Sequence, residues 1–99
     1  MLNGHPARRL PNTLNISVSG ARGDELLAAT PDAAASTGSA CHAGTTEPSP
    51  VLTAMGLDRR RALAAIRLSV GRWTSDQDID RAAVRLTDAY RRLCRRAAI

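Results

Sequence analysis

Residues 65–70 read AIRLSV, a stretch in which apolar and polar residues alternate. Successive side chains of a β-strand point to opposite faces, so one face is expected to carry the aliphatic residues and the other Arg67 and Ser69. Residues 13–19, TLNISVS, alternate in the same way. The sequence therefore predicts two half-buried strands, 13–19 and 65–70.

Short helices are expected between these two strands. Residues 24–30 form a helix that Pro31 ends. Residues 49–56 have a serine for the N-cap, a proline for the first helical position and a glycine after the last turn. Asp58 is expected to cap one further turn over residues 59–61.

The strongest helical signal follows residue 73. Either Thr74 with Gln77 or Ser75 with Asp78 forms a capping box. Aspartates follow at the N-terminal end and arginines gather at the C-terminal end, as the helix dipole favours. An apolar stripe at helical spacing is expected from Ile79, Ala83, Leu86, Tyr90, Leu93 and Ala97.

Residues 32–37 are interpreted as a further strand, and residues 38–49, rich in Gly, Ser, Thr and Pro, as a long loop. We therefore predict that residues 1–99 form one domain of the α+β class. It would have two layers: a small, mainly antiparallel sheet covered by helices on one face, with a long C-terminal helix.

Composition excludes several classes of protein. No apolar run is long enough to cross a membrane, and aromatic residues make up only 2%, which disfavours stacking platforms for nucleic acid. All 14 basic residues are arginines, so no residue of this chain can form a lysine Schiff base. The two cysteines suit a reducing cytosol, and we expect a cytoplasmic protein.

Cys41 is the first candidate for chemistry. Small residues flank it in the segment 36–44, STGSACHAG, and it lies on no apolar periodic face. A reactive thiolate and an unreactive loop cysteine are both compatible with this pattern. Cys94 instead lies beside the apolar stripe, which favours a packing role. The cysteines and histidines have no metal-ligand spacing, so no metal site is expected.

Arg67 is the second candidate. An arginine held on a strand is a good bidentate receptor for a carboxylate, although a solvated sheet face explains the same pattern. Arginines at 59–61 and near the C-terminus could attract nucleic acid. They match no recognition motif, so nucleic-acid binding is disfavoured.

Several motifs in order resemble one family. They are NGHP at residues 3–6, RLPNTLN at 9–15, STGSAC at 36–41, PSPVL at 48–52, AMGL at 54–57 and IRLSVGRWT at 66–74. Together they resemble the small C-terminal domain of the cysteine desulfurases, pyridoxal-phosphate enzymes of aminotransferase class V. The resemblance runs over nearly the whole chain.

The resemblance implies a function. Such an enzyme takes sulfur from L-cysteine as a persulfide on Cys41 and releases alanine. The sulfur then passes to an acceptor, often an iron–sulfur scaffold protein. By position, Arg67 is the receptor for the substrate carboxylate and Arg72 is the second choice. The family is typically homodimeric.

One departure from the family shapes the expected activity. The pyridoxal phosphate of these enzymes is held on a lysine of a large domain, and this chain resembles only most of the small one. It therefore looks like a truncated desulfurase that binds no cofactor and is inactive alone. The alternative is a non-enzymatic sulfur carrier or interaction module that uses Cys41.

Overall fold

The computed structural model describes residues 1–31, 33, 35–38, 40–42 and 45–97, with the backbone alone for residues 40–42, 45, 96 and 97. The elements follow one another along the chain in an α+β order, as predicted. They are β1 (Thr13–Ser17), α1 (Gly23–Ala28), β2 (Ala40–His42), β3 (Thr45–Glu47), α2 (Pro50–Ala54), α3 (Arg59–Leu63), β4 (Ala65–Ser69) and α4 (Asp76–Ala97).

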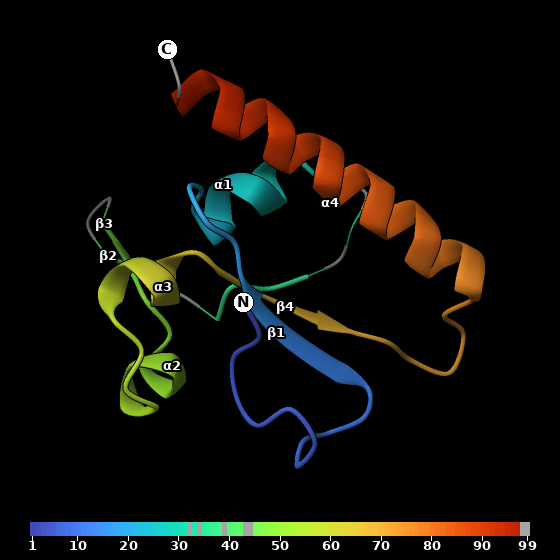
Figure 1. Ribbon diagram of the computed structural model, residues 1–99, viewed down its shortest axis with the longest axis horizontal. Coiled ribbons are helices and arrows are strands. Elements are labelled where there is room, and N and C mark those ends of the chain that lie inside the picture. The colour runs from blue at the N-terminus through green and yellow to red at the C-terminus, as the bar shows by residue number, and fades with distance from the viewer. Residues whose placement is uncertain (32, 34, 39, 43–44, 98–99) are drawn as a thin grey trace.

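The two strands predicted from alternation form the central sheet. β1 and β4 pair antiparallel, with Thr13 opposite Ser69 and Ser17 opposite Ala65. Isolated bridges extend the sheet on both sides, at Leu2 beside β1 and at Ser36 beside β4. Figure 1 shows this pair in the middle of the molecule, with α1 and α4 lying across it.

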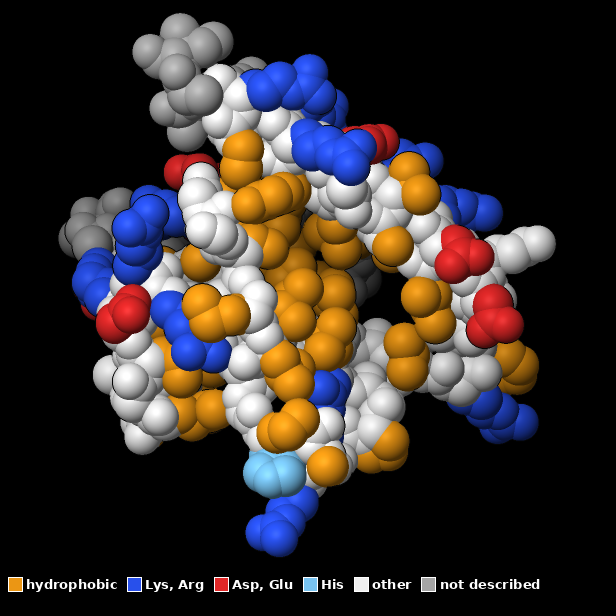
Figure 2. Space-filling view, viewed as in Figure 1, with side chains coloured by type: hydrophobic (Ala, Val, Ile, Leu, Met, Phe, Trp, Pro, Cys, Tyr) orange, Lys and Arg blue, Asp and Glu red, His pale blue; other side chains and the backbone are white. Residues whose placement is uncertain are grey.

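The main hydrophobic core lies between the sheet and these two helices. Leu26 of α1, Ile66 of β4 and Ala89 of α4 are buried together, and Leu68 packs against them half-buried. In Figure 2 the apolar side chains gather in this space, while arginine and aspartate side chains lie on the outer side of α4. Burial of this apolar surface is the main force holding the helices on the sheet.

A second, smaller core forms on the opposite face of the sheet. Ala65 precedes Ile66 and therefore points the other way, where it is buried with Leu52 of α2 and Ala62 of α3. The expectation that helices cover one face is thus incomplete, since α2 and α3 cover one end of the second face. Leu52 supplies the apolar surface that brings α2 there.

Two local predictions need correction. Of the expected strand 32–37, the described residues contribute only the isolated bridge at Ser36, and residues 32 and 34 lie outside the described part. The expected loop 38–49 contains a hairpin, because β2 and β3 pair antiparallel. Threonines in β3 favour extended backbone, a signal that the glycine and proline content concealed.

The predictions for the residues at the ends of α2, α3 and α4 were more accurate than those for residues 32–49. Asp58 accepts a hydrogen bond from the Arg61 amide at 2.8 Å, and Gly56 follows α2 with φ of +88°. The capping box of α4 uses Ser75 and Asp78, whose side chains each accept from the other's backbone N–H at 3.1 and 3.0 Å. Thr74 is not part of this box, because its hydroxyl accepts a hydrogen bond from the Gly71 amide.

The apolar stripe of α4 was predicted only in part. Leu86, Tyr90 and Leu93 pack against the core as expected, but Ala89 between them is the fully buried residue. Ile79 is 48% exposed and Ala83 is exposed, so those two predictions were wrong. The reason is that the first half of α4 does not pack closely on the sheet. The side chain of Ala97 lies outside the described part.

The Asp78 cap predicts a pH effect. The hydrogen bond from the Ser75 amide, helped by the Ser75 hydroxyl, lowers the pKa of Asp78 below its ordinary value of 3.8. A lowered pKa in the folded state stabilises the fold above the unfolded pKa, and this stabilisation is lost as pH falls through the lower value. Asp78→Asn should therefore reduce the loss of α4 helicity on acidification below pH 3.8, measured by circular dichroism. Asp80→Asn, in the same helix but outside the capping box, is the matched control; equal effects of both variants on this loss of helicity would contradict the assignment.

No helix in the part of the chain that the structure describes combines the length and the apolar character needed to cross a bilayer.

Candidate functional site

The segment that contains Cys41 leaves the sheet beside Arg67. Ser36 and Arg67 exchange two backbone hydrogen bonds, with N–O distances of 2.6 and 3.2 Å. Two residues later, the Gly38 amide donates to the Ser36 hydroxyl at 3.0 Å. Gly38 has a φ of +68°, and a Cβ there would lie 3.3 Å from the buried Ser49 hydroxyl. A tight left-handed turn therefore fixes where the chain departs toward Cys41.

The β2–β3 hairpin carries Cys41. Its register places Cys41 opposite Thr46 and His42 opposite Thr45. The side chains of Cys41 and His42 lie outside the described part of the structure, so only their backbone position is established. In Figure 1 the hairpin stands at the side of the molecule next to α3, away from α4.

An arginine of α3 holds the returning strand of this hairpin. The Arg59 guanidinium forms an ion pair with Glu47 at 3.1 Å and donates to the Thr46 carbonyl at 3.4 Å. Both charged side chains are about half exposed. Such a pair contributes little to stability, so its main consequence is to orient β3 relative to α3.

Arg67 lies at the middle of β4, with Asn15 of β1 opposite it. Its side chain is exposed, and among the described residues no carboxylate pairs with it. Arg72 lies beyond the end of β4, and its guanidinium stacks on the Trp73 ring at 4.8 Å. The structure therefore brings Arg67 next to the departure point of the Cys41 segment and places Arg72 in the turn before α4.

A polar network beside Arg67 was missed in the sequence. The Asn3 side-chain amide donates to Asn15 and to the Ser17 hydroxyl, each at 2.8 Å. Ser17 in turn donates to the Arg61 carbonyl at 2.8 Å, and the Arg61 guanidinium donates to Asn3 at 2.9 Å. Asn3 and Ser17 are buried. Asn15 and Ser17 of β1 could have revealed this network in the sequence. They are polar, lie two positions apart and therefore point to the same face of the sheet as Arg67.

Cys94 is half-buried, in keeping with the packing role expected for it. Its sulfur lies 4.0 Å from the Ser19 carbonyl, which also accepts a hydrogen bond from the Tyr90 hydroxyl. The pKa of Tyr90 is raised above its ordinary value of 10.0. The main cause is the contact with Cys94, and loss of solvent is a smaller one. Tyr90 is therefore a neutral hydrogen-bond donor that ties α4 to the turn after β1.

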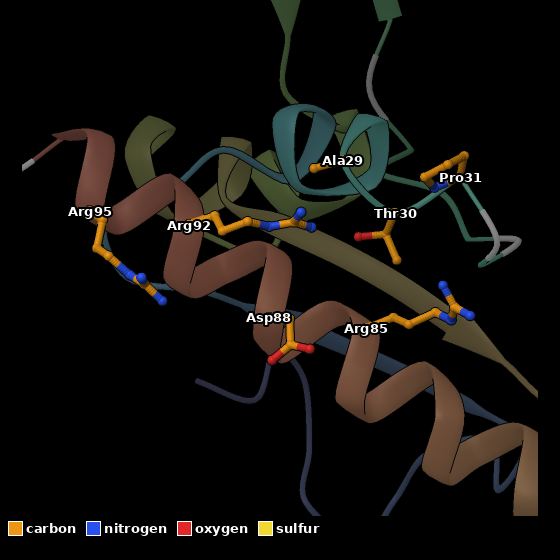
Figure 3. A pocket seen from close by; sticks show the side chains of 7 residues that line it. All are labelled: Ala29, Thr30, Pro31, Arg85, Asp88, Arg92 and Arg95. Carbon is orange, nitrogen blue, oxygen red and sulfur yellow. The ribbon is translucent and has the colours of Figure 1, made fainter.

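A cavity of about 440 Å³ lies between the end of α1 and α4, and the charged residues that line it are Arg85, Asp88, Arg92 and Arg95. Figure 3 shows Arg85 and Arg92 extending toward the end of α1, with Asp88 between them on the helix. Arg67 and Arg72 are not among the described residues that line it. Within the described part of the chain, no three His, Cys, Asp or Glu side chains cluster as a metal site would require.

Comparison with known proteins gives a consistent result. The chain is 47% identical over 79 residues to the cysteine desulfurase IscS of Acinetobacter baumannii strain AYE, covering 80% of this chain. It is 41% identical over 92 residues to the proteins of the same name from Aeromonas salmonicida and Shewanella denitrificans, covering 93% of this chain. No family profile matches it.

These similarities confirm the resemblance to the cysteine desulfurases. The particular proteins that this chain matches are IscS desulfurases. The chain spans only about a fifth of their length, 20% of the Acinetobacter baumannii protein and 23% of the Aeromonas salmonicida protein. A match of 79 residues in a chain of 99 includes residues 21–79 wherever it begins, and therefore Cys41, Arg67 and Arg72.

Proposed function

We propose that this chain is the segment of a cysteine desulfurase that carries the sulfur-accepting thiolate, Cys41. The similarity to IscS proteins across residues 21–79 is the observation that supports this most strongly. The position of Cys41 in a short two-stranded hairpin is compatible with a thiol that meets both a sulfur donor and a sulfur acceptor.

The proposed sulfur transfer uses the Cys41 thiolate as nucleophile. Its Sγ forms a bond to the sulfur of L-cysteine while the carbon–sulfur bond of that substrate breaks. The electron pair stays with the carbon, which takes up a proton and leaves as alanine. Cys41 is then a persulfide, whose outer sulfur passes to the thiolate of an acceptor, in the family often an iron–sulfur scaffold protein.

The cofactor of such a reaction, pyridoxal phosphate, does not fit the residues of this chain. It is bound through a Schiff base to lysine, and all 14 basic residues here are arginines. We therefore infer that the chain alone binds no cofactor and does not turn over cysteine. Cofactor-binding residues would have to come from another polypeptide or from another part of a longer one.

Arg67 is proposed as the receptor for the substrate carboxylate. Its guanidinium is exposed, its strand is fixed by pairing on both sides at Asn15 and Ser36, and it has no carboxylate partner among the described residues. Arg72 is the weaker choice, because its guanidinium already stacks on Trp73.

The test is a chimeric enzyme in which this chain replaces the matching fifth of the Acinetobacter baumannii desulfurase. The chimera should form alanine from L-cysteine, and the isolated chain with pyridoxal phosphate should not. A folded chimera that binds the cofactor but forms no alanine would contradict the proposal. Turnover by the isolated chain would contradict the inference that it is inactive alone.

The same chimera tests whether Arg67 binds the substrate carboxylate. Arg67→Ala removes a charged, bidentate hydrogen bond to the substrate, so KM for L-cysteine should rise about 10- to 100-fold. Arg72→Ala is the matched control and should change KM by less than about threefold, since its stacking partner is Trp73. Steady-state alanine formation measures both values; a larger effect from Arg72→Ala would reverse the assignment.

A non-enzymatic sulfur carrier is the second candidate, favoured by a cysteine in a chain that has no lysine. Here the Cys41 thiolate would attack the outer sulfur of a donor persulfide, R–S–SH. A new sulfur–sulfur bond forms at Cys41, the donor bond breaks, and R–S⁻ leaves. Mass spectrometry of the isolated chain after treatment with an alkyl persulfide should show one added sulfur on Cys41 and none on Cys94. No adduct, or equal labelling of both, would exclude this carrier role.

A further inference from the structure

Asn15 lies directly opposite Arg67 in the central sheet. The Asn15 carbonyl oxygen accepts a hydrogen bond from the Asn3 amide at 2.9 Å, and both backbone groups of Arg67 bond to Ser36. Asn15 and Arg67 therefore form a pair that is not joined through the backbone. In such a pair the two side chains share one face of the sheet, with their Cβ atoms about 4.5–5.5 Å apart.

The orientation of the Asn15 carboxamide follows from the chemistry of its neighbours. A guanidinium can only donate, so the Arg61 Nε at 2.9 Å from Asn3 requires the carboxamide oxygen of Asn3 at that position. The nitrogen of Asn3 then donates to Asn15, which presents its own oxygen 2.8 Å away. This chain of donors and acceptors leaves the Nδ2 amide of Asn15 as the end that is not bonded to Asn3.

The Nδ2 amide of Asn15 has no acceptor among the described residues. The side chain is half-buried, so this amide loses part of its hydration without a hydrogen bond in return. Arg67 cannot supply the acceptor, because a guanidinium carries only donors. Two neighbouring side chains that both donate are complementary to one acceptor that reaches both.

A carboxylate is the acceptor that best fits this pair. Its two oxygens offer about four lone-pair sites, so it can accept two bonds from a guanidinium and a third from an amide. The other residues of β1 and β4 on this face carry no carboxylate; they are Thr13, Ser17, Ala65 and Ser69. L-cysteine bound at Arg67 would bring a carboxylate to this place.

We infer that the Nδ2 amide of Asn15 is a second donor to the substrate carboxylate, beside the Arg67 guanidinium. This inference rests on the proposed function and adds a binding residue to it. Asn3 is a positioning residue, because its bond to Oδ1 of Asn15 determines which end of the carboxamide remains to donate. The two donors together favour an amino acid over an aminothiol that lacks the carboxylate.

Asn15→Asp in the chimeric desulfurase tests the donor directly. The exchange is isosteric and keeps an acceptor oxygen for Asn3, but it replaces the Nδ2 donor with a charged oxygen beside Arg67. That charge competes with the substrate for the guanidinium, so KM for L-cysteine should rise at least about thirtyfold. Asn15→Ala removes one neutral hydrogen bond and should raise KM about 3- to 10-fold.

Asn12→Asp is the matched control for the added charge. Asn12 lies before β1, about 10 Å along the chain from Asn15. Its side-chain oxygen accepts from the Thr13 hydroxyl, a bond that aspartate keeps. KM should therefore change by less than about threefold. An effect equal to that of Asn15→Asp would overturn the inference, because the cause would then be charge acting at long range.

Cysteamine separates substrate binding from a structural role of Asn15. It is L-cysteine without the carboxylate, so its inhibition constant against L-cysteine should change by less than about twofold in Asn15→Ala. An inhibition constant that rises in step with KM would indicate a displaced strand and would overturn the inference. A chimera that Asn15→Ala destabilises without any change in KM would also overturn it, because another part of the enzyme would then hold this amide.

Urea unfolding and Arg67→Ala complete the test. The isolated Asn15→Asp chain should unfold at the urea concentration of the parent, because the bond to Asn3 is retained. If it unfolds earlier, the KM and cysteamine values of Asn15→Ala decide alone. An expected rise in KM for Arg67→Ala with none for either Asn15 variant would overturn this inference only. No response to any of these variants would contradict the proposed carboxylate receptor itself.

Discussion

Gly23→Ala should destabilise the fold by about 2–4 kcal/mol, a large share of the stability of a domain this size. Gly23 begins α1 and is buried against β4. An added Cβ would lie 2.2 Å from the Ala65 carbonyl oxygen and 3.2 Å from Cγ2 of Ile66. That oxygen cannot yield easily, because Ala65 is fully buried and paired with Ser17. Helix α1 would therefore have to move off the sheet.

Urea unfolding followed by circular dichroism measures this effect. Gly71→Ala is the matched control, because a Cβ at Gly71 meets no atom within 4 Å. It should change the free energy of unfolding by less than about 0.5 kcal/mol. Equal unfolding midpoints for the two variants would show that α1 does not pack against β4 as described.

Cys41→Ser should lower alanine formation by the chimeric desulfurase at least about a thousandfold, because an unactivated hydroxyl is a far weaker nucleophile than a thiolate. The exchange is nearly isosteric and lies in the β2–β3 hairpin. The loss should therefore appear in kcat without a loss of folded protein.

Cys94→Ser is the control for this variant. Cys94 lies half-buried on α4, where its sulfur approaches the Ser19 carbonyl. Its replacement should leave kcat within about twofold, since it lies on α4 and not in the hairpin that carries the proposed nucleophile. Retained activity in Cys41→Ser, or loss in Cys94→Ser alone, would contradict the role assigned to Cys41.

Local sequence signals predicted most of the regular structure. The alternation in residues 13–19 and 65–70 defined both central strands, and cap residues located α2, α3 and α4. These signals succeed because each depends on contacts within a few residues. The class of fold followed from the order of the elements.

Nonlocal packing accounts for what the sequence did not reveal. Ala65 appears as a small residue at the start of a strand, yet it joins α2 and α3 in a second core. Similarly, Ile79 fits the apolar stripe of α4 by spacing but is half exposed, because the helix diverges from the sheet there. The periodicity of one helix does not specify how closely its neighbours approach.

The roles of the candidate site residues stay predictions. Cys41 and Arg67 stood out by residue type and context, whereas Arg72 followed only from the resemblance, and the structure adds that Ser36 joins the Cys41 segment to Arg67. The buried network of Asn3, Ser17 and Arg61 was not foreseen, since it links residues up to 58 positions apart. Such contacts leave no periodic trace in a single sequence.

The most direct test of the sulfur-accepting role is to locate sulfur on the chimeric enzyme during turnover. The enzyme would be treated with L-cysteine, alkylated and digested, and the two peptides of this chain that contain Cys41 and Cys94 compared by mass spectrometry. Our account predicts one additional sulfur atom on the Cys41 peptide, none on the Cys94 peptide, and its removal when an acceptor thiol is added. Alanine formation with no sulfur on Cys41, or with the sulfur on Cys94, would contradict it.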